Sequence, residues 1–138
     1  MQNSITVQVV VGKDKATVWK VWTTPEDICQ WNAASADWEC PHATNDLRVG
    51  GEFHATMSAK DGSASFDFNG VYTEVVEQEK IAYTIEGGRK VLVEFSETDA
   101  GTAVVETFEM EDINSEDLQR AGWQAILDNF KRYAEERY

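Results

Sequence analysis

The feature that most constrains the fold is a series of short segments between residues 52 and 110 in which apolar and polar side chains alternate. Alternation with a period of two is typical of β-strands that bury one face and expose the other. Short stretches rich in glycine and charged residues separate the segments, as at residues 60–63 and 99–101. The pattern predicts an antiparallel meander with strands near residues 53–57, 66–73, 81–85, 91–95 and 102–110.

A long amphipathic helix is predicted to follow the meander. The sequence Asn-Ser-Glu-Asp at residues 114–117 supplies a capping side chain and acidic residues, which favour the start of a helix. Apolar side chains then recur at helical spacing, at Trp123, Ile126, Leu127, Phe130 and Ala134. Because an antiparallel sheet needs its apolar face covered, we expect this helix to lie on the inner face of the sheet.

The first part of the chain predicts one strand and two short helices. Residues 5–11 end in three valines and favour a partly buried strand. Asp14 can cap a first short helix, and Thr24 with Pro25 is a typical start for a second. Residues 32–46 show no clear period and are predicted to form a long loop.

These elements together predict one α+β domain over residues 1–138, in which a curved antiparallel sheet grips the last helix. Four segments, taken in order, resemble the START-like, helix-grip superfamily, which includes the birch-pollen allergen, lipid-transfer domains and polyketide cyclases. The segments are residues 18–28 with Trp31, residues 46–53, residues 70–75, and Gly122-Trp123 followed by Leu127 and Tyr133.

Within that superfamily the chain is most similar to homologues of the C-terminal domain of the activator of the 90-kilodalton heat-shock protein ATPase. The resemblance covers nearly the whole chain. It implies a curved sheet wrapped around the C-terminal helix, with two short helices after the first strand. It also implies an apolar cavity between the sheet and that helix, in which members of the superfamily bind lipids, hormones or polyketides.

Aromatic side chains of the predicted strands could line such a cavity, or they could fill a solid core instead. Trp38 would belong to a lid over the cavity, formed by the loop at residues 32–46. The candidate cavity residues are Trp31, Trp38, Phe53, Phe66, Phe68, Tyr72, Tyr83, Phe95, Phe108, Trp123 and Leu127.

Two charged residues are further candidates for the site. Arg48, before Gly50 and Gly51, is a possible polar anchor for a ligand carboxylate, although pairing with a surface acid is the simpler interpretation. Asp67 lies opposite the aromatic face by parity, so we expect it to point outward. Pointing inward, it would be a candidate general base.

We expect no metal and no permanent cofactor. Structural zinc needs about four ligands at tight spacing. The candidate ligands are His42, His54, Cys40 and Asp46, but the chain has only two histidines, 12 residues apart, and no C-x-x-C motif.

The acidic balance bears on the partners of the protein. Twelve basic and 25 acidic residues give a net charge of −13, which argues against nucleic acid or an anionic membrane as the main partner. One acidic stretch is expected to form a solvated surface, or else a contact surface for a basic partner. It comprises Glu106, Glu109, Glu111, Asp112, Glu116 and Asp117.

Cysteine usage and hydropathy indicate the compartment. Cys29 and Cys40 are too few for a disulfide framework and favour reduced thiols. No signal peptide and no apolar run of about 18 residues is visible in the sequence. We therefore expect a cytoplasmic protein without a membrane span.

Three functional hypotheses follow. The first is the binding of a small hydrophobic ligand between the sheet and the C-terminal helix. The second is a co-chaperone-like interaction module that uses its outer surface. The third is an enzyme of the cyclase or hydrolase kind, which would need a titratable group inside the cavity.

Overall fold

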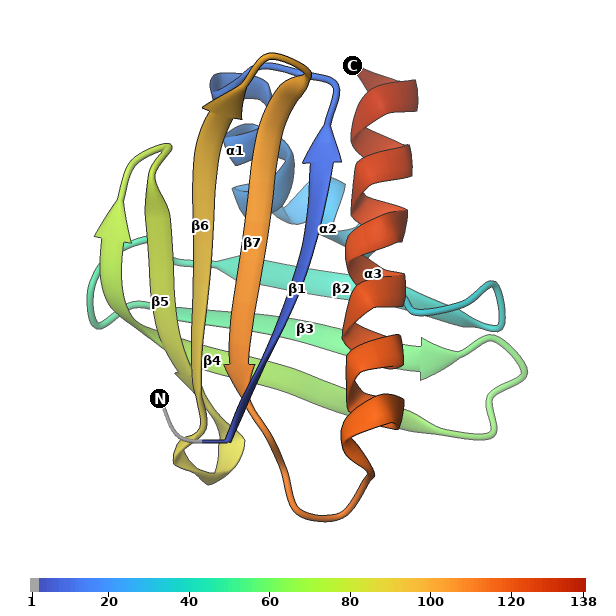
Figure 1. Ribbon diagram of the computed structural model, residues 1–138. Helices are drawn as coiled ribbons and strands as arrows, with labels where there is room; N and C mark the ends of the chain where they lie inside the picture. The colour runs from blue at the N-terminus through green and yellow to red at the C-terminus, as the bar shows by residue number, and fades with distance from the viewer. Residues whose placement is uncertain (1–2) are drawn as a thin grey trace.

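The computed structural model describes residues 3–138 and joins seven strands and a long C-terminal helix (Figure 1). In chain order the elements are β1 Ser4–Val11, α1 Lys15–Thr23, α2 Pro25–Trp31, β2 Trp38–Asn45, β3 Glu52–Ala59, β4 Ser65–Val76, β5 Lys80–Ile85, a 3-10 turn at Glu86–Gly88, β6 Lys90–Thr98, β7 Gly101–Glu109 and α3 Glu116–Arg137.

All seven strands form one antiparallel sheet in the order β1-β7-β6-β5-β4-β3-β2. In Figure 1, strands β2, β3 and β4 run across the direction of β6 and β7, so the sheet curls into a half-barrel beside α3. The β4–β5 register shifts between Tyr72 and Glu74, and an irregularity of this kind lets a strand bend. The predicted helix-grip architecture is therefore confirmed.

The prediction of a long loop at residues 32–46 was wrong, because residues 38–45 form strand β2. This strand lies at the edge of the sheet and contains Pro41, and its register against β3 shifts between Glu39 and His42. Only Cys40 is buried in it. An edge strand with a proline and an irregular register lacks the alternation by which strands are recognised in a sequence.

The predicted helix starts are present. Asp14 accepts a hydrogen bond from the backbone N–H of Thr17 at 3.2 Å, and Ser115 accepts one from that of Leu118 at 3.2 Å. Pro25 is the first residue of α2, where a missing backbone N–H has no consequence. Of the helices within residues 3–138, none has the length and apolar composition needed to cross a membrane.

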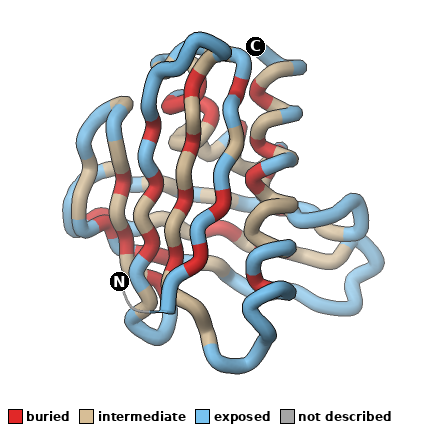
Figure 2. The backbone as a smooth tube through the Cα atoms, viewed as in Figure 1, coloured by how far each residue is buried: buried red, intermediate tan, exposed pale blue. Residues whose placement is uncertain are grey.

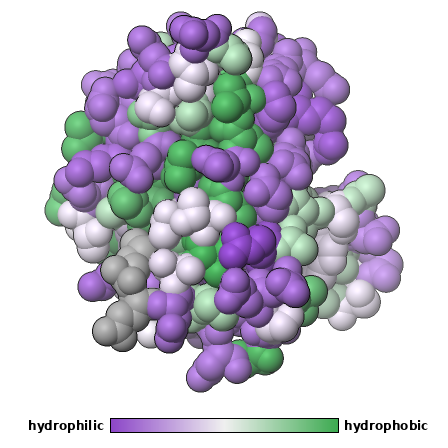
Figure 3. All heavy atoms as spheres, in the orientation of Figure 1, coloured by the Kyte–Doolittle hydropathy of each residue, from purple (hydrophilic) through white to green (hydrophobic). Residues whose placement is uncertain are grey.

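The main core lies between the sheet, the short helices and the C-terminal half of α3 (Figure 2). From α3 it takes Leu127, Phe130 and Ala134, and from α1 it takes Val18 and Val21. All of these side chains are at most 1% exposed. The face of the molecule seen in Figure 3 is covered mostly by hydrophilic side chains, in line with the net charge of −13.

One buried carboxylate ties the end of α3 to α2. Asp27 is buried, and its carboxylate accepts a hydrogen bond of 2.6 Å from the hydroxyl of Tyr133. The hydroxyl of Tyr138 donates to the same carboxylate at 3.0 Å. Hydrogen bonds to a charged acceptor are stronger than those between neutral groups, so this cluster should hold the last turns of α3 in place.

Replacing Asp27 by alanine is expected to lower the free energy of unfolding by about 2 kcal/mol, because both tyrosine hydroxyls lose a charged acceptor. Urea denaturation at pH 7 measures the change. Asp112→Ala is the matched control, since Asp112 is exposed. An equal effect of the two substitutions would show that the tyrosine contacts contribute nothing to stability.

Candidate functional site

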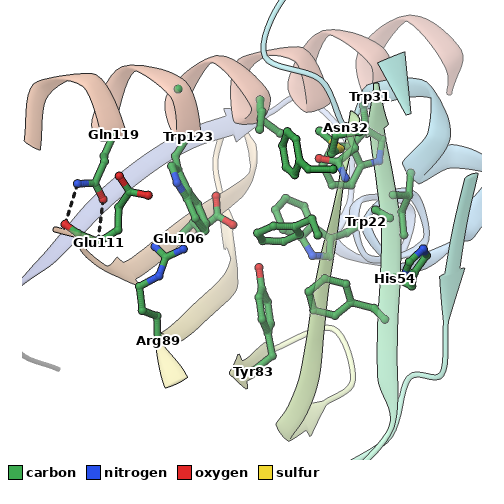
Figure 4. Close-up of a pocket in the computed structure, with 18 of the residues that line it drawn as sticks. Trp22, Trp31, Asn32, His54, Tyr83, Arg89, Glu106, Glu111, Gln119 and Trp123 are labelled. Atoms are coloured by element: carbon green, nitrogen blue, oxygen red, sulfur yellow. Dashed lines mark hydrogen bonds between the residues drawn. The ribbon is translucent and has the colours of Figure 1, made fainter. Parts of the chain in front are cut away.

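A cavity of about 300 Å³ lies between the inner face of the sheet and the N-terminal half of α3 (Figure 4). The helices α1 and α2 close one end of it, and the segment between β7 and α3 borders the other. Eight aromatic side chains line the cavity: Trp22, Trp31, Phe53, Phe66, Phe68, Tyr72, Tyr83 and Trp123. Most natural sites for small molecules are clefts with such apolar walls and a few polar groups.

The aromatic wall is held in place by ring contacts within it. The Phe53 ring meets that of Tyr83 edge to face, with centroids 4.8 Å apart. Phe53 can lie this way because its partner across the strands is Gly70, where an added Cβ would come within 2.3 Å of the Phe53 ring. Trp123 of α3 stacks on Phe108 of β7 at a centroid distance of 3.9 Å.

The apolar stripe of α3 serves two different purposes. Gly122, Trp123 and Ile126 line the cavity, whereas Leu127 and Phe130 pack into the closed core. The prediction that Leu127 lines the cavity was wrong. A helix that spans both regions presents one continuous stripe, because cavity walls and core demand the same apolar residues.

Of the eleven predicted cavity residues, the structure brings seven together around the cavity: Trp31, Phe53, Phe66, Phe68, Tyr72, Tyr83 and Trp123. Phe66 is 53% exposed. Phe95 is buried against Trp19, and Phe108 is buried beneath Trp123, so neither reaches the cavity. Their inward parity was predicted correctly, but parity does not distinguish a cavity wall from the core.

Trp38 lies elsewhere and does not cover this cavity, although Asn32 and Thr44 of the same segment line it. Trp38 belongs to strand β2, packs on Phe66 and borders a second hollow of about 820 Å³ beside α2 and β2. That hollow is lined mainly by polar and small residues, including Gln30, Ser35 and Arg132. It therefore lacks the apolar walls typical of a small-molecule site.

The two charged candidates, Arg48 and Asp67, are on the surface. Arg48 is largely exposed and pairs with Asp46, at 3.0 and 2.9 Å from its Nε to the two carboxylate oxygens. Asp67 points outward, as predicted, where it accepts a hydrogen bond from Thr56 at 3.1 Å and lies 3.6 Å from His54. Among residues 3–138, no three potential metal ligands come together.

The most informative cavity residue is Glu106, for which the charge pattern of the sequence predicts a place on an acidic surface. This prediction was wrong: Glu106 is 6% exposed and lines the cavity. On β7 it alternates in step with Thr102, Val104 and Phe108, all buried. The parity that predicted an inward Phe108 also predicts an inward Glu106, and this was the signal that could have found it.

The carboxyl group of Glu106 makes no hydrogen bond or ion pair with the residues that the structure describes. Within that range every fully enclosed side-chain nitrogen or oxygen has a partner, so the Glu106 oxygens must reach the open space of the cavity. Burial raises the pKa of this carboxyl from its usual 4.5 to about 8. Glu106 is therefore mostly protonated at neutral pH.

Two tyrosines line the same wall and differ in the hydrogen bonding of their hydroxyl groups. The Tyr72 hydroxyl donates to the side-chain oxygen of Asn45 at 2.6 Å, and Asn45 in turn donates to the carbonyl of Thr23 at 2.7 Å. The Tyr83 hydroxyl has no such partner within residues 3–138. Burial, with the nearby Glu106, holds the pKa of Tyr83 well above its ordinary value, so this hydroxyl keeps its proton.

Polar side chains gather at the end of the cavity near α3's first turn. Gln119 is buried and bridges the segment before the helix, accepting from the backbone N–H of Glu111 at 3.0 Å and donating to the carbonyl of Asn114 at 2.8 Å. Arg89, which follows the 3-10 turn, also lines the cavity and is half-buried. Figure 4 shows Arg89, Glu106 and Tyr83 directed toward the same space.

Comparisons with known proteins agree with this architecture. An AHSA1-like protein from Aeromonas hydrophila is 43% identical, with 97% of this chain and 93% of that chain covered and a TM-score of 0.92. A protein from Cytophaga hutchinsonii is 50% identical over 98% of this chain and 94% of that chain, with a TM-score of 0.84. A protein from Chromobacterium violaceum, at 23% identity and a TM-score of 0.86, covers 96% of this chain and 98% of its own and shows the fold alone.

A comparison with curated proteins found no match. The family model described as activator of Hsp90 ATPase homolog 1-like protein matches residues 14–135, which include every strand from β2 to β7 and most of α3. This confirms the resemblance inferred from the sequence. The chain belongs to the family of activator of Hsp90 ATPase homolog 1-like proteins.

Proposed function

We propose that this protein binds a small, mainly apolar molecule in the cavity between the sheet and α3. The observation that carries the proposal is a cavity of about 300 Å³ with aromatic walls, lined by the Glu106 carboxyl and the Tyr83 hydroxyl, neither of which has a partner among residues 3–138. An empty cavity costs stability, because the side chains that line it lose packing contacts. A ligand that fills the space would restore those contacts.

The walls supply enough apolar surface for useful affinity. Burying about 300 Å² of apolar ligand surface contributes about 7 kcal/mol before the cost of association is subtracted. Rings from α1, α2, β3, β4, β5 and α3 surround the space, so a flat or compact apolar molecule can contact them on several sides. Micromolar affinity is therefore expected without a strong polar anchor.

Gly122 offers a direct test, because it lines the cavity and an added Cβ would meet no atom within 4 Å. We expect Gly122→Phe to fill the cavity and abolish binding without lowering the thermal midpoint. Gly122→Ala is the matched control: it should keep binding and raise stability by about 1 kcal/mol, since glycine is unfavourable inside a helix.

Native mass spectrometry of protein purified from its own cells, beside a denatured sample, is the measurement. A discrete additional mass that denaturation removes is expected for the wild type and for Gly122→Ala, but not for Gly122→Phe. If Gly122→Phe retains the additional mass, the ligand is bound outside this cavity and the proposal fails.

The chaperone-module hypothesis rested partly on the acidic stretch after residue 105. The buried position of Glu106 removes one carboxylate from that surface. The enzyme hypothesis needs a titratable group inside the cavity, and that group is Glu106 rather than Asp67. The cavity is the feature that both ligand binding and catalysis would share.

A further inference from the structure

Three side chains at the polar end of the cavity, Arg89, Tyr83 and Glu106, carry hydrogen-bond donors that are free or only weakly paired. Tyr83 and Glu106 are each 6% exposed, and neither has a hydrogen-bond partner within residues 3–138. Arg89 forms no ion pair in that range, and its guanidinium donates only to the carbonyl of Glu109, at 3.3 Å. The guanidinium is a donor that cannot be neutralised, and it carries a full charge.

We propose that this end of the cavity binds the carboxylate of a small apolar acid, with Arg89, Tyr83 and Glu106 as its hydrogen-bond donors. The inference rests on the proposed function and adds to it the chemical class of the ligand. The apolar body would lie against Phe53, Phe68 and Trp123, and its acidic group would face the three donors.

The alternative ligand of opposite charge, an organic cation, fits this end less well. A cation would need an ionised Glu106, whereas burial raises the pKa of that carboxyl to about 8. It would also lie beside the positive charge of Arg89. The carboxylate of Glu111, which borders the same end, already accepts two hydrogen bonds from Asn114, at 2.9 and 2.5 Å.

The groups around Glu106 define the expected pH dependence. The sheet presents Tyr72 and Tyr83, and the neighbouring positions across the strands are Val7 and Val93. Arg89 and Glu111 contribute the charges at the cavity's end, while α3 presents Gln119, Trp123 and Ile126, which do not titrate. The net charge of −13 disfavours an anion, but screening over about 8 Å at physiological salt limits this effect to nearby charges.

Three probes with one ring system separate the alternatives: 2-naphthoate, 2-methylnaphthalene and 2-naphthylmethylammonium. Isothermal titration of the full chain at pH 7 gives the affinity of each. We expect 2-naphthoate to bind about tenfold more tightly than 2-methylnaphthalene, and the ammonium probe to bind more weakly than both. The carboxylate assignment would be overturned if the ammonium probe bound more tightly than 2-naphthoate. Equal affinities for 2-naphthoate and 2-methylnaphthalene would overturn it too.

The pH dependence adds a readout specific to Glu106. Since its protonated form is the donor, the affinity for 2-naphthoate should fall about tenfold between pH 7 and pH 9, while that for 2-methylnaphthalene stays constant. Glu106→Gln keeps a donor, so it should bind 2-naphthoate within about threefold of wild type with no change over this range. An affinity for 2-naphthoate that is independent of pH in the wild type contradicts the role of Glu106.

Arg89→Gln should lower the affinity for 2-naphthoate about tenfold and leave the affinity for 2-methylnaphthalene unchanged. Lys90→Gln, which removes an equal charge from the neighbouring exposed residue, should affect neither probe. If 2-methylnaphthalene binds and Arg89→Gln has no effect on 2-naphthoate, the apolar cavity stands and the carboxylate subsite is refuted. If no probe binds to the folded protein, the proposed function and the subsite fail together.

Discussion

Replacing Glu106 by glutamine is expected to raise the free energy of unfolding by about 3 kcal/mol at pH 7. In the folded protein the carboxyl of Glu106 is buried and has a pKa of about 8, against a usual value of 4.5. The unfolded chain therefore loses this proton near pH 4.5, and the folded chain holds it until about pH 8. The stability that this proton provides is fully present below pH 4.5 and is lost as the pH rises to about 8.

Urea denaturation of wild type and Glu106→Gln at pH 5, 7 and 9 tests the sign and the size of this change in the free energy of unfolding. The variant should exceed the wild type by about 1, 3 and 5 kcal/mol respectively. Glu94→Gln, which removes an exposed carboxyl from strand β6 of the same sheet, is the control and should show no such rise. A difference between Glu106→Gln and wild type that does not change with pH would mean that Glu106 titrates as it does in water.

A loss of this size bears on the function of the residue. Domains are stable by only about 5 to 15 kcal/mol, so a buried carboxyl that costs about 3 kcal/mol consumes a large part of that margin. Local choices that contradict the fold are expected mainly at functional sites. Val104 and Phe108 on the same face of β7 show that an apolar residue fits this environment. This cost is in line with the proposed role of the Glu106 carboxyl as a donor to a bound ligand.

The meander and the C-terminal helix could be predicted from the sequence because their patterns are regular. Between residues 52 and 110 the sheet has one buried face, and strands β3, β5, β6 and β7 show it by alternating burial. Strand β2 could not be predicted in this way. It pairs with one neighbour only and buries a single residue, Cys40, so its sequence carries no comparable constraint.

The candidate site was harder to predict than the fold, for two physical reasons. Charge distribution along the chain suggested a surface for Glu106, while the parity of β7 placed it inside, and parity proved the stronger constraint. The cavity itself is a matter of packing: Leu127 and Ile126 are adjacent on α3, yet one fills the core and the other borders open space. Sequence periodicity identifies the apolar face but not where the packing stops.

Trp123 lies where the cavity meets the closed core. Whereas Glu106→Gln should stabilise the protein, removal of the Trp123 ring should destabilise it the most. Its ring stacks on Phe108 at 3.9 Å with an interplanar angle of 9°, and it meets Phe68 edge to face at 6.1 Å. Its ring thereby joins the N-terminal half of α3 to β7. Trp123→Ala should lower the free energy of unfolding by about 3 kcal/mol, at the lower end of the range for such truncations because one face borders the cavity.

Trp123→Phe is the matched variant, since it keeps an aromatic ring over Phe108 and should lose only about 1 kcal/mol. Urea denaturation measures both changes, and titration with 2-methylnaphthalene in the absence of urea measures their effect on binding. We expect Trp123→Phe to retain binding and Trp123→Ala to lose it, because the loss of the ring both removes a wall and loosens α3 over the cavity. A loss of less than 1 kcal/mol for Trp123→Ala would mean that α3 is held over the cavity by Gln119 and the core residues Leu127 and Phe130 instead.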